Sequence, residues 1–436
     1  MLSIMKLHTG LGTMQEVIVI GGGVIGLTSA WWLLEAGYRV SLLEREDSVG
    51  SAASFRNGGQ LSYRYVAPLA DAGVPIKALQ WLFQEDGPLR FRPEADMRQW
   101  RWLSSFLAQC RTGANQKTSA TLLQLGELSR QSMAQLALDV PLGEFSWRDP
   151  GKLVVYRSRA AFAAAGKVAA ALPLDKDHTS EVLSPAECVQ REPALAAAQN
   201  ALAGGIYNGG EAVADCHAFC LALADRLRAH PHFSGFIAGE ARALVSENGK
   251  VSALETSAGR LTADAYVLAA GIQSRTLAAT AGIYLPLYPL KGYSLSAPVG
   301  PGHCAPEISV TDFERKVLYA RIGDTLRVAA MVDMVGEDAS LDAKRIAGLA
   351  RQVRETMPNG ADYTAMLPWA GLRPATPGGA PIIGATRYSN LYLNVGQGPL
   401  GFTFACGSAS LLADVMRNKA PPFAMDRLRL RTVAGL

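Results

Sequence analysis

A glycine-rich turn near the start of the chain has the residue types and spacing of a nucleotide-binding loop. It reads Gly21-Gly22-Gly23-Val24-Ile25-Gly26, a G-x-G-x-x-G pattern. In such a turn the first glycine allows a sharp reversal, the second lets the backbone approach a pyrophosphate, and the third lets the helix pack on the strand. Glu44 stands further along, where a carboxylate can accept hydrogen bonds from a ribose diol. These residues predict a dinucleotide site.

The segments around this turn must be a strand, a helix and a second strand for the prediction to hold. Residues 17–20 are β-branched and apolar, as expected of a strand buried on both faces of a parallel sheet. Residues 24–35 fit a helix that Gly37 ends, and residues 38–43 fit the second strand. A membrane-spanning helix is the alternative for this uncharged stretch, but three consecutive glycines and the flanking acids argue against it.

A second glycine-rich turn occurs near the end of the chain. Gly396-Gln397-Gly398-Pro399-Leu400-Gly401 separates an expected strand at 391–395 from an expected helix at 404–416, whose N-terminus can face a negative charge. The loop 51–62 is rich in small residues and glycine, as expected where backbone lies along a ligand. Residues 265–271 fit an apolar strand ending in glycine, and such strands end at the cofactor crevice of a doubly wound sheet.

The composition is that of a globular enzyme. The chain has 436 residues, enough for two domains, and its net charge of +4 includes no basic run, so nucleic acid is an unlikely partner. Six cysteines form no regular framework, which favours a reducing compartment. Cys216 and Cys220 are expected in a helix rather than in a metal site, because no second ligand pair accompanies them. Residues 1–13 show no signal peptide, and we expect a cytoplasmic protein.

The remaining segments alternate between helical and strand-like patterns. Residues 78–140 are mainly helical, with aromatic residues spaced to form core. Strands are expected at 152–156, 203–207, 288–295, 316–321 and 325–332, a hairpin at 240–256, and helices at 160–172, 184–199, 215–230 and 340–357. Ligand-binding segments on both sides of the long middle region indicate that a substrate domain is inserted into the cofactor domain.

Five motifs together resemble one group of flavoenzymes. They are GGGVIG from residue 21, the SAAS and NGGQ loop, YPLKGYSL from residue 288, WAGLRPATP from residue 369 and LYLNVGQGPLGFTFACGSA from residue 391. The set is similar to the catalytic subunit of FAD-dependent D-amino acid dehydrogenases, and more broadly to the glycine oxidase, sarcosine oxidase and D-amino acid oxidase group. The resemblance implies an α/β fold with a Rossmann-like FAD-binding domain (14–80, 206–285 and 361–420) and an inserted mixed-sheet substrate domain (81–205 and 286–360).

The resemblance also implies which residues bind FAD. The ADP half should lie on Gly21, Gly23, Ile25, Gly26, Glu44 and Arg45, and the pyrophosphate and ring on Ser54, Asn57, Gly58, Gly59 and Gln60. Ala270 and Gly271 should touch the middle of the cofactor, and Gly398, Leu400, Gly401, Phe402 and Thr403 should hold the pyrimidine edge. That edge, near N1 and C2=O, carries negative charge in reduced flavin. The chain departs from the family at Gln397, where the family's turn contains His, and no metal is implied.

The resemblance further implies that Arg373, in an Arg-Pro pair like that of glycine oxidase and D-amino acid oxidase, clamps the substrate carboxylate. The chemistry supports this role, since a guanidinium fork can bind a carboxylate through two parallel hydrogen bonds. We expect Arg373 in a loop, and the alternative role is a structural salt bridge or an anchor for the backbone. Tyr293 and Tyr319, on expected strands, are candidates to donate hydroxyls to the carboxylate or to shape the pocket, and the alternative is that they are half-buried sheet tyrosines. Tyr63 and Arg64 are bulkier than their family counterparts and are hypothesised to set side-chain preference, with Arg64 favouring polar or acidic substrates.

The implied reaction is oxidative deamination of a D-amino acid by hydride transfer from Cα to flavin N5, giving a 2-oxo acid and ammonia. The resemblance favours a quinone or another respiratory-chain carrier over oxygen as electron acceptor, and a peripheral contact with the inner face of a bacterial membrane. The alternatives are oxidation of glycine, sarcosine, D-proline or hydroxyproline, or a role as the flavin subunit of a larger electron-transfer complex. A nicotinamide-dependent dehydrogenase is a further alternative, but it gives no reason for the second glycine turn. The oligomeric state is open.

Overall fold

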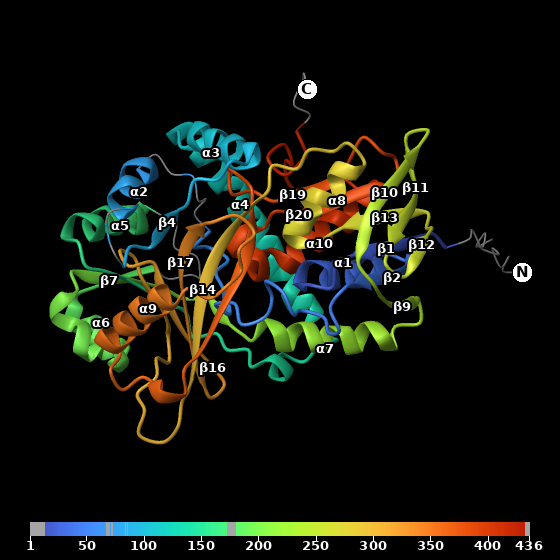
Figure 1. Cartoon of the computed structure of the whole chain (residues 1–436). Coiled ribbons are helices and arrows are strands. Elements are labelled where there is room, and N and C mark those ends of the chain that lie inside the picture. The colour runs from blue at the N-terminus through green and yellow to red at the C-terminus, as the bar shows by residue number, and fades with distance from the viewer. Residues whose placement is uncertain are drawn as a thin grey trace, which may run out of the picture.

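The computed structural model describes residues 14–66, 70, 73–82, 84, 86–171 and 180–431. The expectation about a signal peptide concerns residues 1–13 and lies outside these ranges. Two large sheets form two lobes, with the six-stranded sheet at the right of Figure 1 and the nine-stranded sheet at the left. This arrangement is the predicted α/β architecture of a Rossmann-like domain and a mixed-sheet domain.

The first sheet has the strand order β19-β20-β13-β1-β2-β9 and is parallel except for its β19–β20 pair. Its strands are β1 (Glu16–Ile20), β2 (Arg39–Glu44), β9 (Phe233–Ala238), β13 (Ala265–Leu268), β19 (Ile382–Ala385) and β20 (Leu391–Val395). Val17 and Val19 of β1 pack into the hydrophobic cluster on one face, and Ile18 and Ile20 into the cluster on the other. The prediction that this strand is buried on both faces is confirmed.

The second sheet has the order β18-β14-β17-β16-β15-β5-β7-β6, with β4 beside β17. Its strands are β4 (Leu89–Phe91), β5 (Lys152–Tyr156), β6 (Ser180–Leu183), β7 (Gly204–Asn208), β14 (Tyr288–Pro298), β15 (Ser309–Asp312), β16 (Val317–Ile322), β17 (Thr325–Met334) and β18 (Leu367–Ala375). One face packs against helix α9 (Ala343–Thr356), whose Leu349 and Val353 share a hydrophobic cluster with strand residues. The other face is free to border a site.

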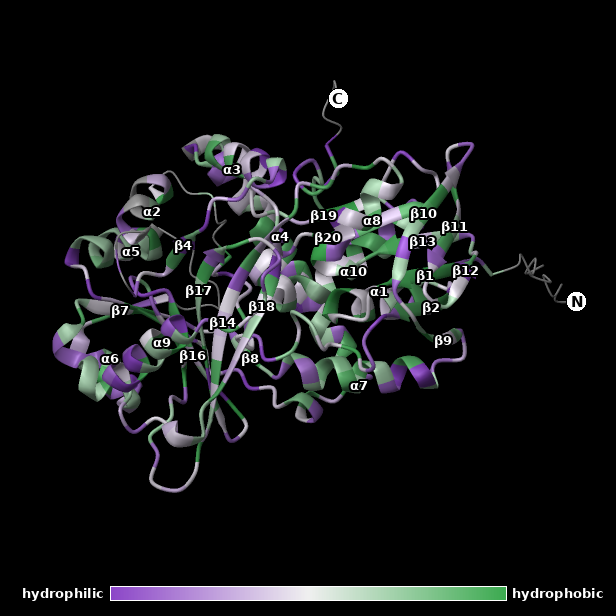
Figure 2. Ribbon diagram, in the orientation of Figure 1, coloured by the Kyte–Doolittle hydropathy of each residue, from purple (hydrophilic) through white to green (hydrophobic). Residues whose placement is uncertain are grey.

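Smaller strands and the remaining helices complete the two lobes. Strands β10 (Ala241–Glu247), β11 (Lys250–Thr256) and β12 (Gly259–Leu261) form an antiparallel sheet that contains the predicted hairpin, and β3 (Gln60–Leu61) pairs with β8 (Ala212–Val213). The helices outside the core are α2 (Val74–Leu82), α3 (Met97–Gln109), α5 (Arg159–Ala171), α6 (Pro185–Arg191) and α8 (Ser274–Thr280). Helices α6 and α7 (Cys216–Ala229) alternate hydrophilic and hydrophobic residues, as helices with one packed face do (Figure 2).

Three predicted boundaries differ from the observed elements. The helix predicted at 184–199 ends at Arg191 and continues as a 3-10 helix from Pro193, because proline cannot donate the backbone hydrogen bond that a helix interior needs. Strands β7 and β18 both belong to the nine-stranded sheet, although the predicted FAD-binding ranges begin at 206 and 361. Those two range limits rest only on a change of sequence pattern.

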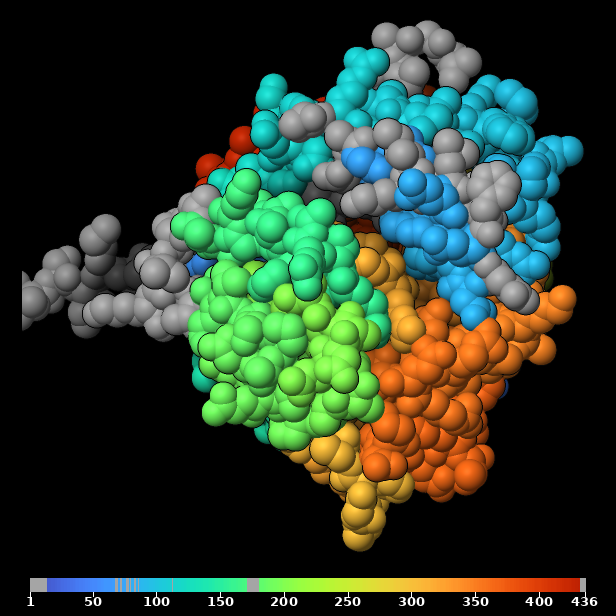
Figure 3. All heavy atoms as spheres, turned by 90° about the vertical axis from the view of Figure 1, so that its left-hand side faces the viewer, coloured from blue at the N-terminus to red at the C-terminus, as the bar shows by residue number. Residues whose placement is uncertain are grey.

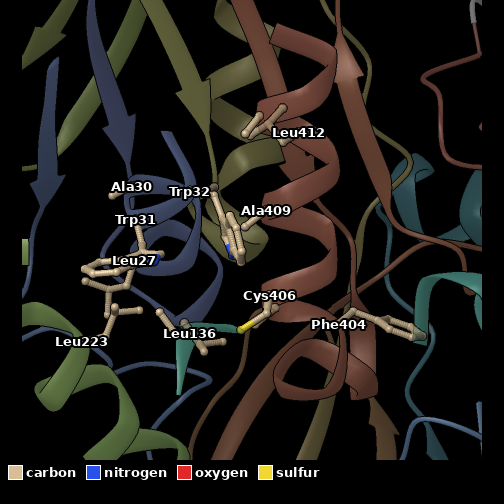
Figure 4. Close-up of a cluster of buried hydrophobic side chains, with 14 of the residues drawn as sticks. Leu27, Ala30, Trp31, Trp32, Leu136, Leu223, Phe404, Cys406, Ala409 and Leu412 are labelled. Carbon is tan, nitrogen blue, oxygen red and sulfur yellow. The ribbon is translucent and has the colours of Figure 1, made fainter. Parts of the chain in front are cut away.

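The core of the first lobe is built where three helices meet. Helix α1 (Val24–Glu35) packs on α10 (Gly401–Met416), and α10 packs on α4 (Thr112–Leu136). Figure 4 shows Trp32 of α1 beside Ala409 of α10, and Leu136 of α4 beside Cys406. By length and composition residues Gly398–Met416 could cross a membrane, but 67% of that stretch is buried inside the protein. Its hydrophobicity is explained by this core position.

The contact between α4 and α10 predicts the effect of one methyl group. A Cβ at Gly407 would lie 2.7 Å from the Ser129 backbone nitrogen, and the Gly407 N–H already donates to Ser129 Oγ at 3.0 Å. Gly407→Ala is therefore expected to lower the free energy of unfolding by about 1–3 kcal/mol through overpacking. Gly113→Ala in α4 is the control, because open space surrounds Gly113 and alanine there should stabilise the helix by about 0.5–1 kcal/mol. Urea unfolding of both variants checks the difference, and equal stabilities would contradict this packing.

Candidate active site

A cavity of about 1560 Å³ lies between the carboxyl ends of β1, β2 and β13 and the open face of the nine-stranded sheet. Its volume exceeds the roughly 300–1,000 Å³ typical of a small-ligand pocket, so a dinucleotide and a small substrate can share it. The carboxyl ends of parallel strands are where doubly wound sheets bind ligands. The cavity therefore occupies the position at which the sequence predicts the cofactor.

The first glycine turn has the close contacts that its sequence predicts. Gly21 has a φ of +109°, and a Cβ there would lie 2.7 Å from the Ala269 carbonyl oxygen. A Cβ at Gly26 would lie 1.7 Å from the Gly21 carbonyl oxygen, so only glycine lets α1 start this close to β1. The Glu44 carboxylate accepts hydrogen bonds from the backbone N–H groups of Gly22, Arg45 and Glu46. The acid is thereby fixed at the cavity wall, where a ribose diol would reach it.

Among the described helices, α1, α8 and α10 present N-termini to the cavity without a capping side chain of their own. Helices α3, α6, α7 and α9 begin at Asp96, Ser184, Asp215 and Asp342, whose side chains accept from the first-turn N–H groups. Helices α1 and α10 begin at Gly23 and Leu400, which provide no such bond, although Ser54 Oγ accepts from Val24 N at 3.0 Å. Free N–H groups and the positive end of a helix suit a diphosphate at α1 and a negative ring edge at α10. The site fits FAD.

The loop after Glu44 is held against the nine-stranded sheet. Asn57 Oδ1 accepts from Gly59 N at 3.0 Å, and Arg327 Nη1 donates to the Asn57 carbonyl at 2.8 Å. Gly59 has a φ of +66°, and a Cβ there would lie 2.3 Å from Ile322 and 2.7 Å from the Ala214 carbonyl oxygen. The loop therefore lies between two other segments and borders the cavity along its length.

The structure gathers the predicted cofactor residues around this one cavity. The residues in its lining are Gly21, Gly23, Ile25, Glu44, Arg45, Ser54, Asn57, Gly58, Gly59, Gln60, Ala270, Gly271, Gly398, Leu400, Gly401, Phe402 and Thr403. Gly26 is outside the lining, because it serves the contact between α1 and β1. The individual contacts with FAD stay predictions.

Arg373 lies in a strand, not in the predicted loop. It is in β18, an edge strand of the nine-stranded sheet, where prolines such as Pro374 are tolerated because one side needs no ladder hydrogen bonds. The guanidinium crosses the neighbouring strand over Gly292, where a Cβ would lie 2.1 Å from Nη2. Arg373 lines the cavity, and none of the ion pairs among the described residues includes it. Burial lowers the pKa of Arg373 to about 10, so it remains a cation at neutral pH.

Arg373 donates a hydrogen bond to the backbone carbonyl of a residue whose backbone conformation is strained. Arg373 Nη1 donates to the Met331 carbonyl oxygen at 2.9 Å, and Met331 has a φ of +68°, which non-glycine residues rarely adopt. The register between β14 and β17 shifts at this point, so Met331 belongs to a β-bulge. Strain of this kind costs roughly 1–3 kcal/mol and gathers at functional sites. The bulge aims a carbonyl at the guanidinium without adding a negative charge.

The two predicted tyrosines do not present their hydroxyls to the cavity. Tyr293 borders the cavity, but its hydroxyl donates to Asp333 Oδ2 at 3.1 Å, and Arg345 of α9 binds the same carboxylate. Tyr319 is fully buried in the cluster that packs against α9, whereas its neighbour Leu318 lines the cavity. Successive strand residues point to opposite faces, and these tyrosines occupy the α9 face. Neither is a carboxylate ligand here.

The proposed selectivity residues are also outside the cavity. Tyr63 is 3% exposed and packs in the hydrophobic core of the first lobe, which raises the pKa of its hydroxyl through burial. Arg64 is exposed, and its backbone N–H donates to Glu211 Oε1 at 3.2 Å. The next residue, Tyr65, does line the cavity. The hypothesis that Tyr63 and Arg64 select the substrate side chain is therefore not supported.

Sequence reasoning missed Lys152, which lines the cavity and is 4% exposed. It is the first residue of β5, a position where a lysine usually marks the solvated start of an apolar strand. Nothing in the sequence distinguished it from such a residue. Among the lining residues that the structure describes, the carboxylates are Glu44, Glu46 and Glu240, all beside the six-stranded sheet, and histidine does not occur.

Comparison with known proteins gives a consistent result. Residues 16–415 match the family model described as FAD dependent oxidoreductase. The chain is 48% identical to D-amino acid dehydrogenase 2 of Pseudomonas aeruginosa, over 93% of this chain and 96% of that one, and 43% identical to D-amino acid dehydrogenase 2 of Ralstonia nicotianae, over 95% and 100%. Among solved structures it is similar to glycine oxidase from Geobacillus kaustophilus, with a TM-score of 0.74, 20% identity and coverage of 97% and 100%.

The tight packing at Gly59 predicts that a larger residue at this position will weaken FAD binding. Gly59→Ala adds a methyl group against Ile322 and Ala214 and should displace the loop, so that the purified protein retains less than about a tenth of its flavin. Gly249→Ala is the matched control, because Gly249 has a φ of +75° but nothing near its Cβ, and it should retain its flavin. The ratio of flavin to protein absorbance after dialysis checks both, and equal retention would contradict the role of the Gly59 contact.

Proposed function

The chain belongs to the FAD dependent oxidoreductase family, and from that premise we propose that it oxidises D-amino acids to 2-oxo acids and ammonia. The relatives named D-amino acid dehydrogenase support this substrate class. Within the site, the main support for it is the position of Arg373 in the cavity lining. The Arg373 guanidinium belongs to none of the ion pairs among the described residues, and the donors that the Met331 carbonyl leaves free can bind a planar anion such as the carboxylate of an amino acid.

The residues that line the cavity indicate what the protein and what FAD would each contribute to the reaction. FAD, when bound, accepts the electron pair that leaves the substrate with the Cα hydrogen. Arg373 fixes the carboxylate and so determines how the substrate enters, while Leu290, Met331 and Trp369 beside it keep water from the reacting carbon. The described lining places no carboxylate and no histidine beside Arg373, so no such group is available to remove a Cα proton. The arrangement supports hydride loss from a substrate with a neutral amine.

We further propose that a quinone or another lipid-soluble carrier accepts the electrons, at the inner face of a membrane. Beyond Arg373 the cavity is lined by apolar residues of α2, β4 and α3, among them Trp81, Phe91 and Phe106. Leu107 of α3 lines the cavity and is 49% exposed, which places the apolar wall at the protein surface. Met97 and Trp100 of α3 are also exposed. Figure 3 shows the face on which α2 and α3 lie beside the β5–β7 segment and α9.

Removal of the Arg373 charge tests the substrate proposal. Arg373→Met should lower kcat/KM for D-amino acids by about 100-fold or more, because two charge-assisted hydrogen bonds are worth roughly 3 kcal/mol or more together. Arg373→Lys should recover only part of the loss, since an ammonium cannot bind a carboxylate in a fork. Arg64→Ala removes the same charge outside the cavity and should leave both kcat/KM and the substrate ranking unchanged. A normal kcat/KM in Arg373→Met would refute the clamp.

The acceptor proposal is tested at the exposed end of the apolar wall. Leu107→Ser should slow electron transfer to a long-chain quinone in lipid vesicles by about tenfold, the factor expected when roughly 1.5 kcal/mol of leucine burial is lost. The rate of electron transfer from Leu107→Ser to a water-soluble dye should equal that of the wild-type protein. Leu138→Ser is the control, because Leu138 is 84% exposed and lies outside the cavity lining. Equal quinone rates in the two variants would count against a lipid-soluble acceptor at this opening.

A further inference from the structure

Lys152 is a buried cation that the proposed function leaves unused. Its Nζ donates to Gln60 Oε1 at 3.0 Å and to Ser62 Oγ at 2.9 Å, and it lies 4.2 Å from the centre of the Tyr65 ring. None of the ion pairs among the described residues includes it. The buried carboxylate of Glu211 acts on this ammonium electrostatically but forms no ion pair with it among the described residues. Burying an ammonium without a direct ion pair is costly, whereas a methionine of similar length would fill the same space without that cost. That the protein has a charged lysine at this buried position indicates that the charge interacts with a bound ligand.

The contacts of Lys152 lead to the N-terminus of α10. Ser62, which accepts from Lys152, has its backbone N–H directed at Thr403 Oγ1 at 3.1 Å, and Thr403 stands in the first turn of α10. Gln60, the other acceptor, also bonds to Ser309 Oγ, and Ser309 is the register partner of Lys152. Lys152, Gln60, Ser62 and Thr403 all line the cavity. The lysine and the positive end of α10 therefore share one wall.

A second group on this wall lacks a partner. Thr311 lies two residues beyond Ser309 in β15, on the same face as Lys152, and it lines the cavity. Its Oγ1 is buried and has no hydrogen-bond partner among the described residues. Buried hydroxyls are normally bonded, so an unpartnered one at a cavity wall is available to a ligand. The wall thus offers a charge, a helix N-terminus and a free hydroxyl to one ligand.

We propose that Lys152 and the N-terminus of α10 together form the wall that receives the pyrimidine edge of FAD, with Lys152 stabilising the negative charge that this edge gains on reduction. Lys152 acts here through its charge and is not a ligand of the substrate carboxylate. The proposal rests on FAD binding, which the family establishes, and is independent of the identity of the substrate.

The charged groups around Lys152 determine how the effect depends on pH. Burial lowers the pKa of Lys152 to about 8, and the buried carboxylate of Glu211 opposes that shift. Tyr65, whose pKa burial raises to about 12, stays neutral, and Lys316 is a second cation of the lining, above the Phe313 ring. Lys152 is thus charged below about pH 8 and loses its charge above it, so its support for reduced flavin should fade as the pH rises through 8.

The test is the reduction equilibrium of the FAD-loaded protein against a reference dye, without any amino acid. Lys152→Met should shift that equilibrium at pH 7 about tenfold toward oxidised flavin, which is about 30 mV for a two-electron couple. Glu211→Gln removes the carboxylate that keeps the pKa of Lys152 from falling further, so this variant should lose the support of Lys152 for reduced flavin at a lower pH than the wild-type protein. The wild-type protein should show a change of slope near pH 8 that Lys152→Met lacks. A conformational readout, the thermal midpoint, should be unchanged or higher in Lys152→Met.

Three results would overturn the proposal. One is an unchanged equilibrium in Lys152→Met, and another is a change of slope in Glu211→Gln at the same pH as in the wild-type protein or at a higher pH, which would separate the pH dependence from the charge of Lys152. The third is a changed substrate ranking in Lys152→Met at an unchanged reduction equilibrium, which would make Lys152 a contact of the substrate side chain. Lys152→Arg, which keeps the charge, should restore the wild-type equilibrium if the variant retains FAD. Because no amino acid is present, failure here leaves the D-amino acid proposal standing.

Discussion

The proposed substrate clamp depends on the charge of Arg373, which belongs to none of the ion pairs among the residues that the structure describes. Arg373 is held by the carbonyl of Met331, across a strand that carries Gly292 where the guanidinium passes. Each of these features has a cost, in backbone strain at Met331 and in desolvation of the cation. The proposed function explains these costly features, because a carboxylate supplied by the protein would neutralise the charge that is proposed to bind the substrate. The rest of the nine-stranded sheet keeps this arrangement rigid through its packing on α9.

On the cofactor side of the cavity, positive charge comes from backbone groups as well as from a side chain. At Gly21, Gly26 and Gly59 a single added carbon would meet neighbouring backbone or side-chain atoms, so the glycines let separate segments approach one another around the cavity. The helix ends at α1 and α10 then supply positive partial charge. The described lining presents N–H groups and cations to the cavity, and its carboxylates lie near the six-stranded sheet.

The sequence predicted most reliably what local signals determine. The strand, glycine turn and helix around Gly21, the hairpin and the second glycine turn all carry their signal within a few residues. Arg373 was misplaced in a loop because Gly371 and Pro374 read as loop residues, and only the position of β18 at the sheet edge makes a strand possible. Tyr293 and Tyr319 were misassigned because both faces of their strands are buried, so alternation cannot say which face borders the cavity. Lys152 is recognisable only after folding brings Gln60 and Ser62 to it.

The most direct test of the central claim is anaerobic titration of the FAD-loaded protein with paired D- and L-amino acids, glycine and sarcosine. Flavin absorbance reports reduction without reference to the later electron acceptor. The account predicts that D-amino acids bleach the flavin and that their L-enantiomers do not. Bleaching only by L-amino acids, by glycine or by sarcosine, or by none of the panel, would contradict it.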